Sequence, residues 1–199
     1  MNTSPWNKDR IIGQKTTSDI SYLGIRIRLE LEGKTRDLAL FNMALDSKLR
    51  GCDLVNLKVS DVAYGSSVSS RATVLQQKTS SPVQFEITKG TREAVAALIK
   101  LGNLHSKDFL FRSRIGTNRH ISTRQYSRIF HRWVEKLGLE ASLYSTHSMR
   151  RTKPYLIYKK TKNLRVIQLL LGHKKLESTV RYLGIEVDDA LEISESIEV

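Results

Sequence analysis

Residues 1–18 are polar and have no regular pattern of apolar positions, so we expect them to form a flexible arm. A regular pattern of apolar positions is present in residues 35–62, "TRDLALFNMALDSKLRGCDLVNLKVSDV". Apolar side chains recur in this segment at helical spacing; they are Leu38, Phe41, Leu45 and Leu49. Because glycine often ends a helix, we expect the first helix to stop at Gly51 and Asp53 to cap a second one.

Residues 69–88, "SSRATVLQQKTSSPVQFEIT", have a different pattern. Val74 and the segment 83–87 are β-formers on either side of the turn-forming "KTSSP". This arrangement predicts an antiparallel hairpin with Lys78 at its turn.

Helical periodicity returns after the hairpin. Residues 90–103, "GTREAVAALIKLGN", predict an amphipathic helix, and residues 122–139 predict another that begins at a Ser/Thr cap. The apolar stripe of this second helix consists of Tyr126, Ile129, Phe130, Trp133 and Leu137. Further helices are expected over residues 146–160 and 163–172 and around Tyr182.

Pro154 interrupts the pattern of the helix expected over residues 146–160. Its ring would clash with the carbonyl of Arg150, so we expect either a kink or the start of a new helical turn. The elements together indicate an α+β fold that is mostly helical, with one small antiparallel sheet.

The net charge of the chain indicates which kind of partner it binds. The chain has 33 Lys and Arg against 20 Asp and Glu, a net charge of +13. Residues 186–199 hold six acids and no base, so the rest of the chain carries 33 bases against 14 acids. A basic body with an acidic tail favours a polyanionic partner, nucleic acid first, because Lys and Arg release the counterions of phosphates.

Other bulk features exclude several classes. Cys52 is the only cysteine, so there is no disulfide framework and no cysteine-rich zinc site. The apolar runs are shorter than the roughly 20 residues that cross a membrane, and residues 1–20 lack a secretory signal. We expect a cytoplasmic protein, associated with the nucleoid in a bacterium.

Two segments near the C-terminus carry candidate chemistry. In "STHSMRRT", His147 and Arg150 share one face of a helix start, where an imidazole and a guanidinium suit a phosphate. In "LLLGHKKLESTVRYLG", His173 and Tyr182 are nine residues apart and would face opposite sides of a single helix. Gly172 is expected to end one helix and Ser178 or Thr179 to cap the next, which lets the two side chains converge.

The candidates follow a fixed order along the chain: Arg50 in "LRGCDLVNL", Lys78 in "QQKTSSPV", His147, Arg150, His173 and Tyr182. This set resembles the catalytic domain of the tyrosine recombinases, also called the phage integrase family, over about residues 20–185. Lys58 and Lys89 compete with Lys78, but neither lies at the expected hairpin turn.

The resemblance implies an enzyme that cleaves and rejoins DNA without a metal ion, a nucleotide or another cofactor. Tyr182 is then the nucleophile, which attacks a backbone phosphate, forms a 3′-phosphotyrosine and releases a 5′-hydroxyl. A free tyrosine has a pKa near 10, so it needs a proton acceptor, and His147 is the expected base.

The other members of the set are expected to act on the phosphate. Arg50 and Arg150 would neutralise the non-bridging oxygens in the transition state, and His173 would add a hydrogen bond. Lys78 would protonate the departing 5′ oxygen.

The expected organisation is an arm of residues 1–18, a catalytic domain of residues 19–185 and an acidic tail of residues 186–199. The short N-terminal part is similar to that of single-domain members such as the fimbrial phase-variation recombinases; the alternative is a fragment. In the family the tail docks on a neighbouring protomer; the alternative is a solvated tail.

The resemblance also implies the partners. The first is double-stranded DNA. The second is further copies of the chain, which form a homo-oligomer (a tetramer) on that DNA. The third is an accessory DNA-bending protein or a second recombinase. Arg119, Arg124 and Arg128 are candidates for DNA contact outside the catalytic set.

Three rival functions remain at this point. A type IB topoisomerase uses a similar catalytic set to relax supercoils, a non-catalytic DNA-binding protein could share the fold, and a basic adaptor could bind RNA. The filled catalytic set argues against the last two.

Overall fold

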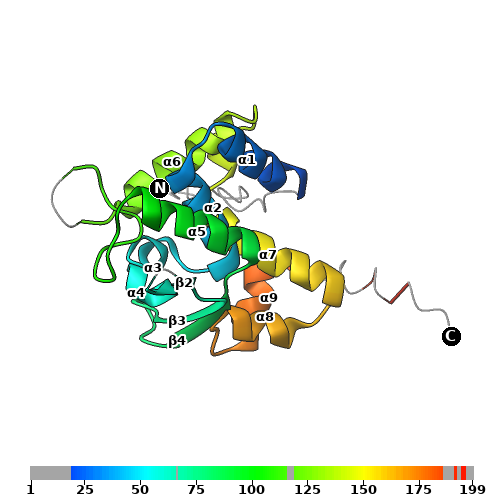
Figure 1. The fold of residues 1–199 in the computed structure, drawn as a ribbon. Coiled ribbons are helices and arrows are strands. Elements are labelled where there is room, and N and C mark those ends of the chain that lie inside the picture. The colour runs from blue at the N-terminus through cyan, green and yellow to red at the C-terminus, as the bar shows by residue number, and fades with distance from the viewer. Residues whose placement is uncertain (1–18, 66, 116–118, 186–190, 192–193, 196–199) are drawn as a thin grey trace, which may run out of the picture.

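The computed structural model describes residues 19–65, 67–115, 119–185, 191 and 194–195. The expected arm of residues 1–18 and most of the expected tail of residues 186–199 lie outside this part. Figure 1 shows a helical upper half, with the strands and the last two helices of the C-terminal part below it. No helix in the described ranges is both long and apolar enough to cross a membrane.

The helical upper half surrounds α2 (Thr35–Ser47), which packs against α1, α5 and α7. The other helices of this half are α1 (Asp19–Leu31), α5 (Lys89–Leu101) and α6 (Thr123–Glu135). The long helix α7 (Thr146–Thr161) packs both against α2 and against the last two helices of the C-terminal part. The helices expected over residues 90–103 and 122–139 are thus confirmed as α5 and α6. The apolar stripe of α6 is buried as expected, and Leu137, which follows the end of the helix, is partly buried.

The end of α2 differs from the prediction. The helix ends at Ser47, because Lys48 takes a left-handed conformation with φ 55°. Gly51 then begins α3 (Gly51–Val55), with Arg50 at its N-cap, so Gly51 starts a helix rather than ending one. Asp53 lies inside α3 and accepts a hydrogen bond from the backbone N–H of Gln77 at 2.9 Å, so its predicted capping role was wrong.

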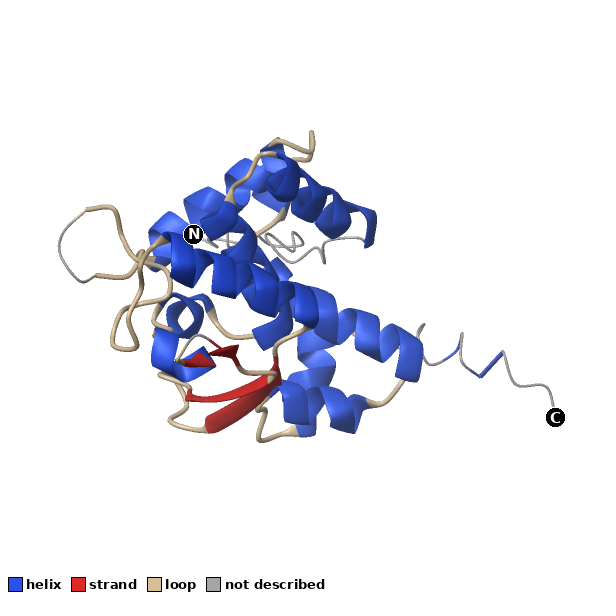
Figure 2. Cartoon of the chain, in the orientation of Figure 1, coloured by secondary structure: helices blue, strands red, loops and turns tan. Residues whose placement is uncertain are grey.

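Two small antiparallel ladders follow α4 (Val59–Val62), where the sequence predicted one sheet. The first pairs β1 (Ala63–Tyr64) with β2 (Ser67–Val68). The second is the predicted hairpin, in which β3 (Arg71–Leu75) pairs with β4 (Pro82–Glu86). In Figure 2 the strands lie together at one side of the helices.

The C-terminal part is a bundle of α7, α8 (Leu164–Leu171) and α9 (Leu176–Leu183). A short 3₁₀ turn before α7, η1 (Ala141–Leu143), packs against α6. One helix, α7, spans both sides of Pro154. A small apolar cluster of Tyr158, Ile167 and Leu171 joins α7 to α8, and Tyr182 of α9 packs against it. The position of Tyr182 therefore depends on this bundle.

The turn between α8 and α9 was predicted in part. Gly172 ends α8 with φ 67°, as expected. However, α9 begins at Leu176 with Lys175 at its N-cap, four residues earlier than a cap at Thr179 would allow. Thr179 is instead fully buried within the helix, and Tyr182 lies in its last turn.

Candidate active site

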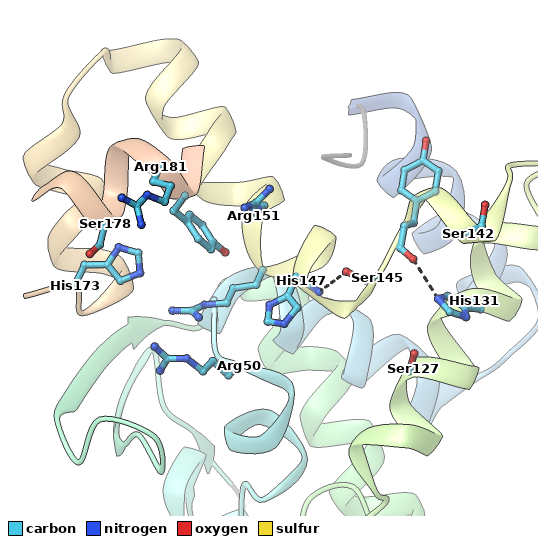
Figure 3. Close-up of a pocket in the computed structure, with 13 residues that line it drawn as sticks. Arg50, Ser127, His131, Ser142, Ser145, His147, Arg151, His173, Ser178 and Arg181 are labelled. Atoms are coloured by element: carbon cyan, nitrogen blue, oxygen red, sulfur yellow. Dashed lines mark hydrogen bonds between the residues drawn. The ribbon is translucent and has the colours of Figure 1, made fainter. Parts of the chain in front are cut away.

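A pocket of about 860 Å³ opens where α3, α6, α7 and the α8–α9 turn meet. Five of the six predicted catalytic residues line it; they are Arg50, His147, Arg150, His173 and Tyr182. Figure 3 shows Arg50, His147 and His173 around one space although they come from three separate segments of the chain. The fold thus brings together residues that are up to 132 positions apart in the sequence.

Arg150 is held from two sides. It is 4% exposed, and its Nε donates to the backbone carbonyl of Lys48 at 2.7 Å. Its Nη2 donates to the carbonyl of Leu171 at 3.4 Å. These bonds fix the guanidinium between the end of α2 and the end of α8, so its remaining N–H donors have a defined direction.

Arg50 is held by the hairpin. Its Nη1 donates to Oε1 of Gln76 at 2.7 Å, and Gln76 is itself 1% exposed. Because Arg50 is also the N-cap residue of α3, its backbone position is set by the turn after Lys48. The two arginines are therefore anchored on different elements but line the same pocket.

Tyr182 lies among cationic and aromatic groups. Its ring meets that of His173 edge-on, with centroids 5.4 Å apart and an interplanar angle of 81°. The guanidinium carbons of Arg150 and Arg151 lie 5.5 and 4.9 Å from the ring centroid. The hydroxyl is buried and makes no hydrogen bond of normal geometry within the described chain.

Burial raises the pKa of Tyr182 to about 12, although the charges of Arg150, Arg151 and Arg50 act in the opposite direction. The hydroxyl is therefore protonated at neutral pH. It can serve as a nucleophile only if a base takes its proton or if the site changes when a substrate enters.

The surroundings of His147 and His173 favour the neutral form of both imidazole rings. Burial, followed by the charges of Arg150 and Arg50, lowers the pKa of His173 to about 4. Nδ1 of His173 lies 3.1 Å from Oγ1 of Thr179, which fixes the ring orientation. The pKa of His147 is also lowered, first by partial desolvation of its ring and then by Arg150 and the other cations nearby, even though the residue remains open to solvent.

The start of α7 presents His147. Ser145 is the N-cap, and its Oγ accepts a hydrogen bond from the backbone N–H of His147 at 3.2 Å. Ser148 lies three residues after the cap, and its hydroxyl accepts from the N–H of Ser145 at 3.1 Å, which completes a capping box. This cap places His147 one turn before Arg150 on the same helix.

Lys78 is the one member of the set that does not line the pocket. It lies exposed in the turn between β3 and β4, as predicted, and its charge is one of those that lower the pKa of His147. The competing lysines do not line the pocket either: Lys58 lies over the ring of Phe109, and Lys89 lies near Glu93.

The predicted DNA-contact arginines, Arg119, Arg124 and Arg128, are all exposed and lie outside the pocket. Arg128 lines a separate hollow on α6 together with His131, which also lines the pocket. This hollow extends the polar surface from the pocket along α6.

Sequence reasoning missed two residues of the site, Arg151 and Gln76. Arg151 directly follows the HxxR motif, and only its contact with Tyr182 distinguishes it from a surface arginine. Gln76 lies two residues before Lys78, and no local pattern indicates that it is buried against Arg50.

Comparison with known proteins identifies the fold and the family. The model of the phage integrase family matches residues 27–187. The chain belongs to the phage integrase family, whose members are the tyrosine recombinases. The resemblance predicted from the ordered catalytic set is confirmed, as is the mostly helical α+β fold.

Relatives within the family carry names of the same kind. A probable integrase/recombinase of Bacillus subtilis, YoeC, is 29% identical over 158 residues, which cover 79% of this chain and 82% of YoeC. Tyrosine recombinase XerC of Caldanaerobacter subterraneus is 26% identical over 77% of this chain and 42% of XerC. The chain thus spans most of YoeC but only about half of the XerC relatives.

Solved structures of phage integrase family members share the fold. The crystal structure of XerA recombinase matches with a TM-score of 0.75 and 20% identity, over 92% of this chain and 65% of XerA. XerH site-specific recombinase, crystallised with its difH substrate before cleavage, matches with a TM-score of 0.70 and 16% identity. That match covers 92% of this chain and 54% of XerH.

Proposed function

We propose that this chain is a site-specific DNA recombinase that cleaves and rejoins strands through a 3′-phosphotyrosine at Tyr182. The observation that carries the proposal is one pocket in which a buried tyrosine lies against His173 and two guanidinium groups. Membership of the phage integrase family and the names of the relatives support the same reaction.

The first task of the site is to hold a phosphodiester. Arg150 and Arg50 are fixed by hydrogen bonds on one side, and the N–H donors that remain are free to bind the non-bridging oxygens. The pentacoordinate transition state carries more negative charge on these oxygens than the ground state does, and the two fixed cations offset this additional charge.

His173 supplies a neutral donor in this proposal. We assign the donor role in the contact between Thr179 Oγ1 and His173 Nδ1, 3.1 Å apart, to the hydroxyl. The proton of the imidazole is then on Nε2 and can be given to a phosphate oxygen as a hydrogen bond. A histidine with a pKa of about 4 keeps this form throughout the neutral range.

The chemical step then has a complete proton balance. His147 takes the proton of Tyr182 as the phenolic oxygen forms a bond to phosphorus. The bond from phosphorus to the 5′ oxygen breaks, and Lys78 gives a proton to that oxygen. Resealing is the reverse: a 5′-hydroxyl loses its proton to Lys78, attacks the phosphotyrosine and releases Tyr182, which regains its proton from His147.

Double-stranded DNA is the proposed substrate, and the charge of the chain supports it. Six of the 20 acidic residues lie in residues 186–199, so the rest of the chain is strongly basic. Arg119, Arg124 and Arg128 are exposed and available to contact phosphates. Strand exchange needs four active sites for two duplexes, so we propose a tetramer on DNA, assisted by a DNA-bending protein or a second recombinase.

Tyr182→Phe tests the proposed function. This variant should bind DNA as the parent does and form no covalent complex, because the ring is kept and only the nucleophilic oxygen is lost. Relaxation of supercoiled DNA without any exchange between two sites would instead favour a topoisomerase. A normal yield of covalent complex from Tyr182→Phe would exclude Tyr182 as the nucleophile.

A further inference from the structure

The turn of the β3–β4 hairpin is connected to the active site through one buried glutamine. The side-chain oxygen of Gln76 accepts a hydrogen bond from Arg50 Nη1 at 2.7 Å and a second from Thr79 Oγ1 at 2.9 Å. A single atom therefore joins a phosphate-binding arginine to the residue that directly follows Lys78.

The backbone of Gln76 closes the same turn. Its N–H donates to the carbonyl of Ser81 at 3.0 Å, and its carbonyl accepts from the N–H of Ser80 at 2.8 Å. Ser80 has φ 48°, a conformation that a serine rarely adopts without support from its surroundings. The shape of the turn that carries Lys78 thus depends on Gln76 at both the main chain and the side chain.

Gln76 also lies near the segment that carries His173. A Cβ atom added to Gly172 would come within 2.5 Å of Val83 Cγ2 and 3.9 Å of Gln76 Nε2. The α8–α9 turn is therefore packed closely on the hairpin where Gln76 leaves β3. Gln76 is 1% exposed, so its amide has exchanged water for these protein partners.

We infer that Gln76 is a positioning residue that couples Arg50 to the Lys78 turn, so that the phosphate-binding group and the proton donor are placed together. The inference rests on the proposed function for the roles of Arg50 and Lys78. It goes beyond that function because it assigns the coupling to a residue that contacts neither the nucleophile nor the leaving group.

Two substitutions separate the two halves of this role. Gln76→Ala removes the shared acceptor, so both Arg50 and the turn lose their support. Gln76→Glu keeps an oxygen for both donors but adds a negative charge beside Arg50, so the turn stays in place while the charge of Arg50 is offset. Gln84→Ala is the matched control, because Gln84 is an exposed glutamine on the neighbouring strand β4.

The test compares two DNA substrates. One has an ordinary phosphodiester, and the other has sulfur in place of the 5′ bridging oxygen, so that its thiolate leaves without a proton donor. On ordinary DNA, Gln76→Ala should lower the rate of covalent complex formation about 100-fold, with binding within about threefold of the parent. On the sulfur substrate the defect should shrink to about tenfold, since only the contribution of Arg50 is still lost.

Gln76→Glu should show equal defects on the two substrates, and Gln84→Ala should show none. Equal defects for Gln76→Ala on both substrates would overturn the coupling, because Gln76 would then act on Arg50 alone. A normal rate for Gln76→Ala on ordinary DNA would overturn it as well.

A readout without DNA separates this inference from the proposed function. Amide hydrogen exchange over residues 76–81 should become at least tenfold faster in Gln76→Ala and in Arg50→Met, and it should be unchanged in Gln84→Ala. Unchanged exchange in both variants would overturn the coupling even if the parent enzyme cleaves DNA. A parent that forms no covalent complex, with exchange that responds as expected, would count against the proposed function alone.

Discussion

The guanidinium of Arg151 lies 4.9 Å from the centre of the Tyr182 ring, closer than that of Arg150 at 5.5 Å. A cation over an aromatic face is attracted to the ring, by about 1–2 kcal/mol where both are partly desolvated. Arg151 is also among the charges that lower the pKa of Tyr182 against the effect of burial. Arg151 thus acts on both the position and the acidity of the proposed nucleophile.

Replacing Arg151 should therefore impair cleavage more than binding. We expect Arg151→Gln to slow covalent complex formation about tenfold, measured in single turnover with enzyme in excess. Arg151→Lys, which keeps the charge but not the planar group, should lose less activity. The matched control is Lys160→Gln, which removes an exposed charge from the last turn of the same helix. Equal losses in Arg151→Gln and Lys160→Gln would show that only overall charge matters.

If His147 is the base, the rate of cleavage should decrease at acidic pH, which gives the pH profile an acidic limb. The pKa of His147 lies below its ordinary value of 6.5, and only the neutral form accepts a proton. The rate should therefore be level near neutral pH and fall as the pH drops below 6.5, and His147→Ala should remove this limb together with most of the activity. Single-turnover rates from pH 5 to 8 measure it. A limb that persists in the residual activity of His147→Ala would assign it to another group.

His173 makes the folded chain sensitive to acid. Its pKa is about 4 in the folded state and near 6.5 when unfolded, so the unfolded chain binds more protons between these values. The stability contributed by the neutral ring is complete above pH 6.5 and is lost as the pH falls toward 4. The thermal midpoint of His173→Gln should fall less between pH 6.5 and 4.5 than that of the parent, as followed by circular dichroism. Parallel curves would contradict this assignment.

Gly172 tests how closely the His173 turn is packed. Gly172→Ala should destabilise the chain by roughly 2–4 kcal/mol, because the residue has φ 67° and its new methyl group would meet Val83. Gly33→Ala separates the two causes, since Gly33 has φ 60° with nothing within 4 Å and should cost only about 1–2 kcal/mol. Denaturant unfolding measures both values. Equal losses would show that backbone strain alone is responsible.

Local signals account for what the sequence predicted correctly. The helix stripes, the hairpin and the end of α8 at Gly172 depend on residues close together in the chain. The ordered set of polar residues was recognised because each member lies in a short motif. The sequence therefore identified the family and five residues that line one pocket.

The errors have a common physical cause, which is side-chain contacts that form only in the folded chain. Lys48 takes a left-handed conformation in which its buried Nζ contacts Glu86 at 2.7 Å and the carbonyl of Asp46 at 2.6 Å. No property of lysine itself indicates a helix end. Likewise, Thr179 looked like a helix cap, but it lies inside α9, where its hydroxyl meets His173. Partners of this kind become visible only when the chain is folded.

The most direct test of the proposed chemistry is to trap the covalent complex on nicked double-stranded DNA and to map both ends of the new bond. Peptide sequencing by mass spectrometry should find the nucleotide on Tyr182, joined through a 3′-phosphate, and the released strand should begin with a 5′-hydroxyl. Attachment to another residue, or a linkage through a 5′-phosphate, would contradict the assignment of Tyr182 and the direction of attack.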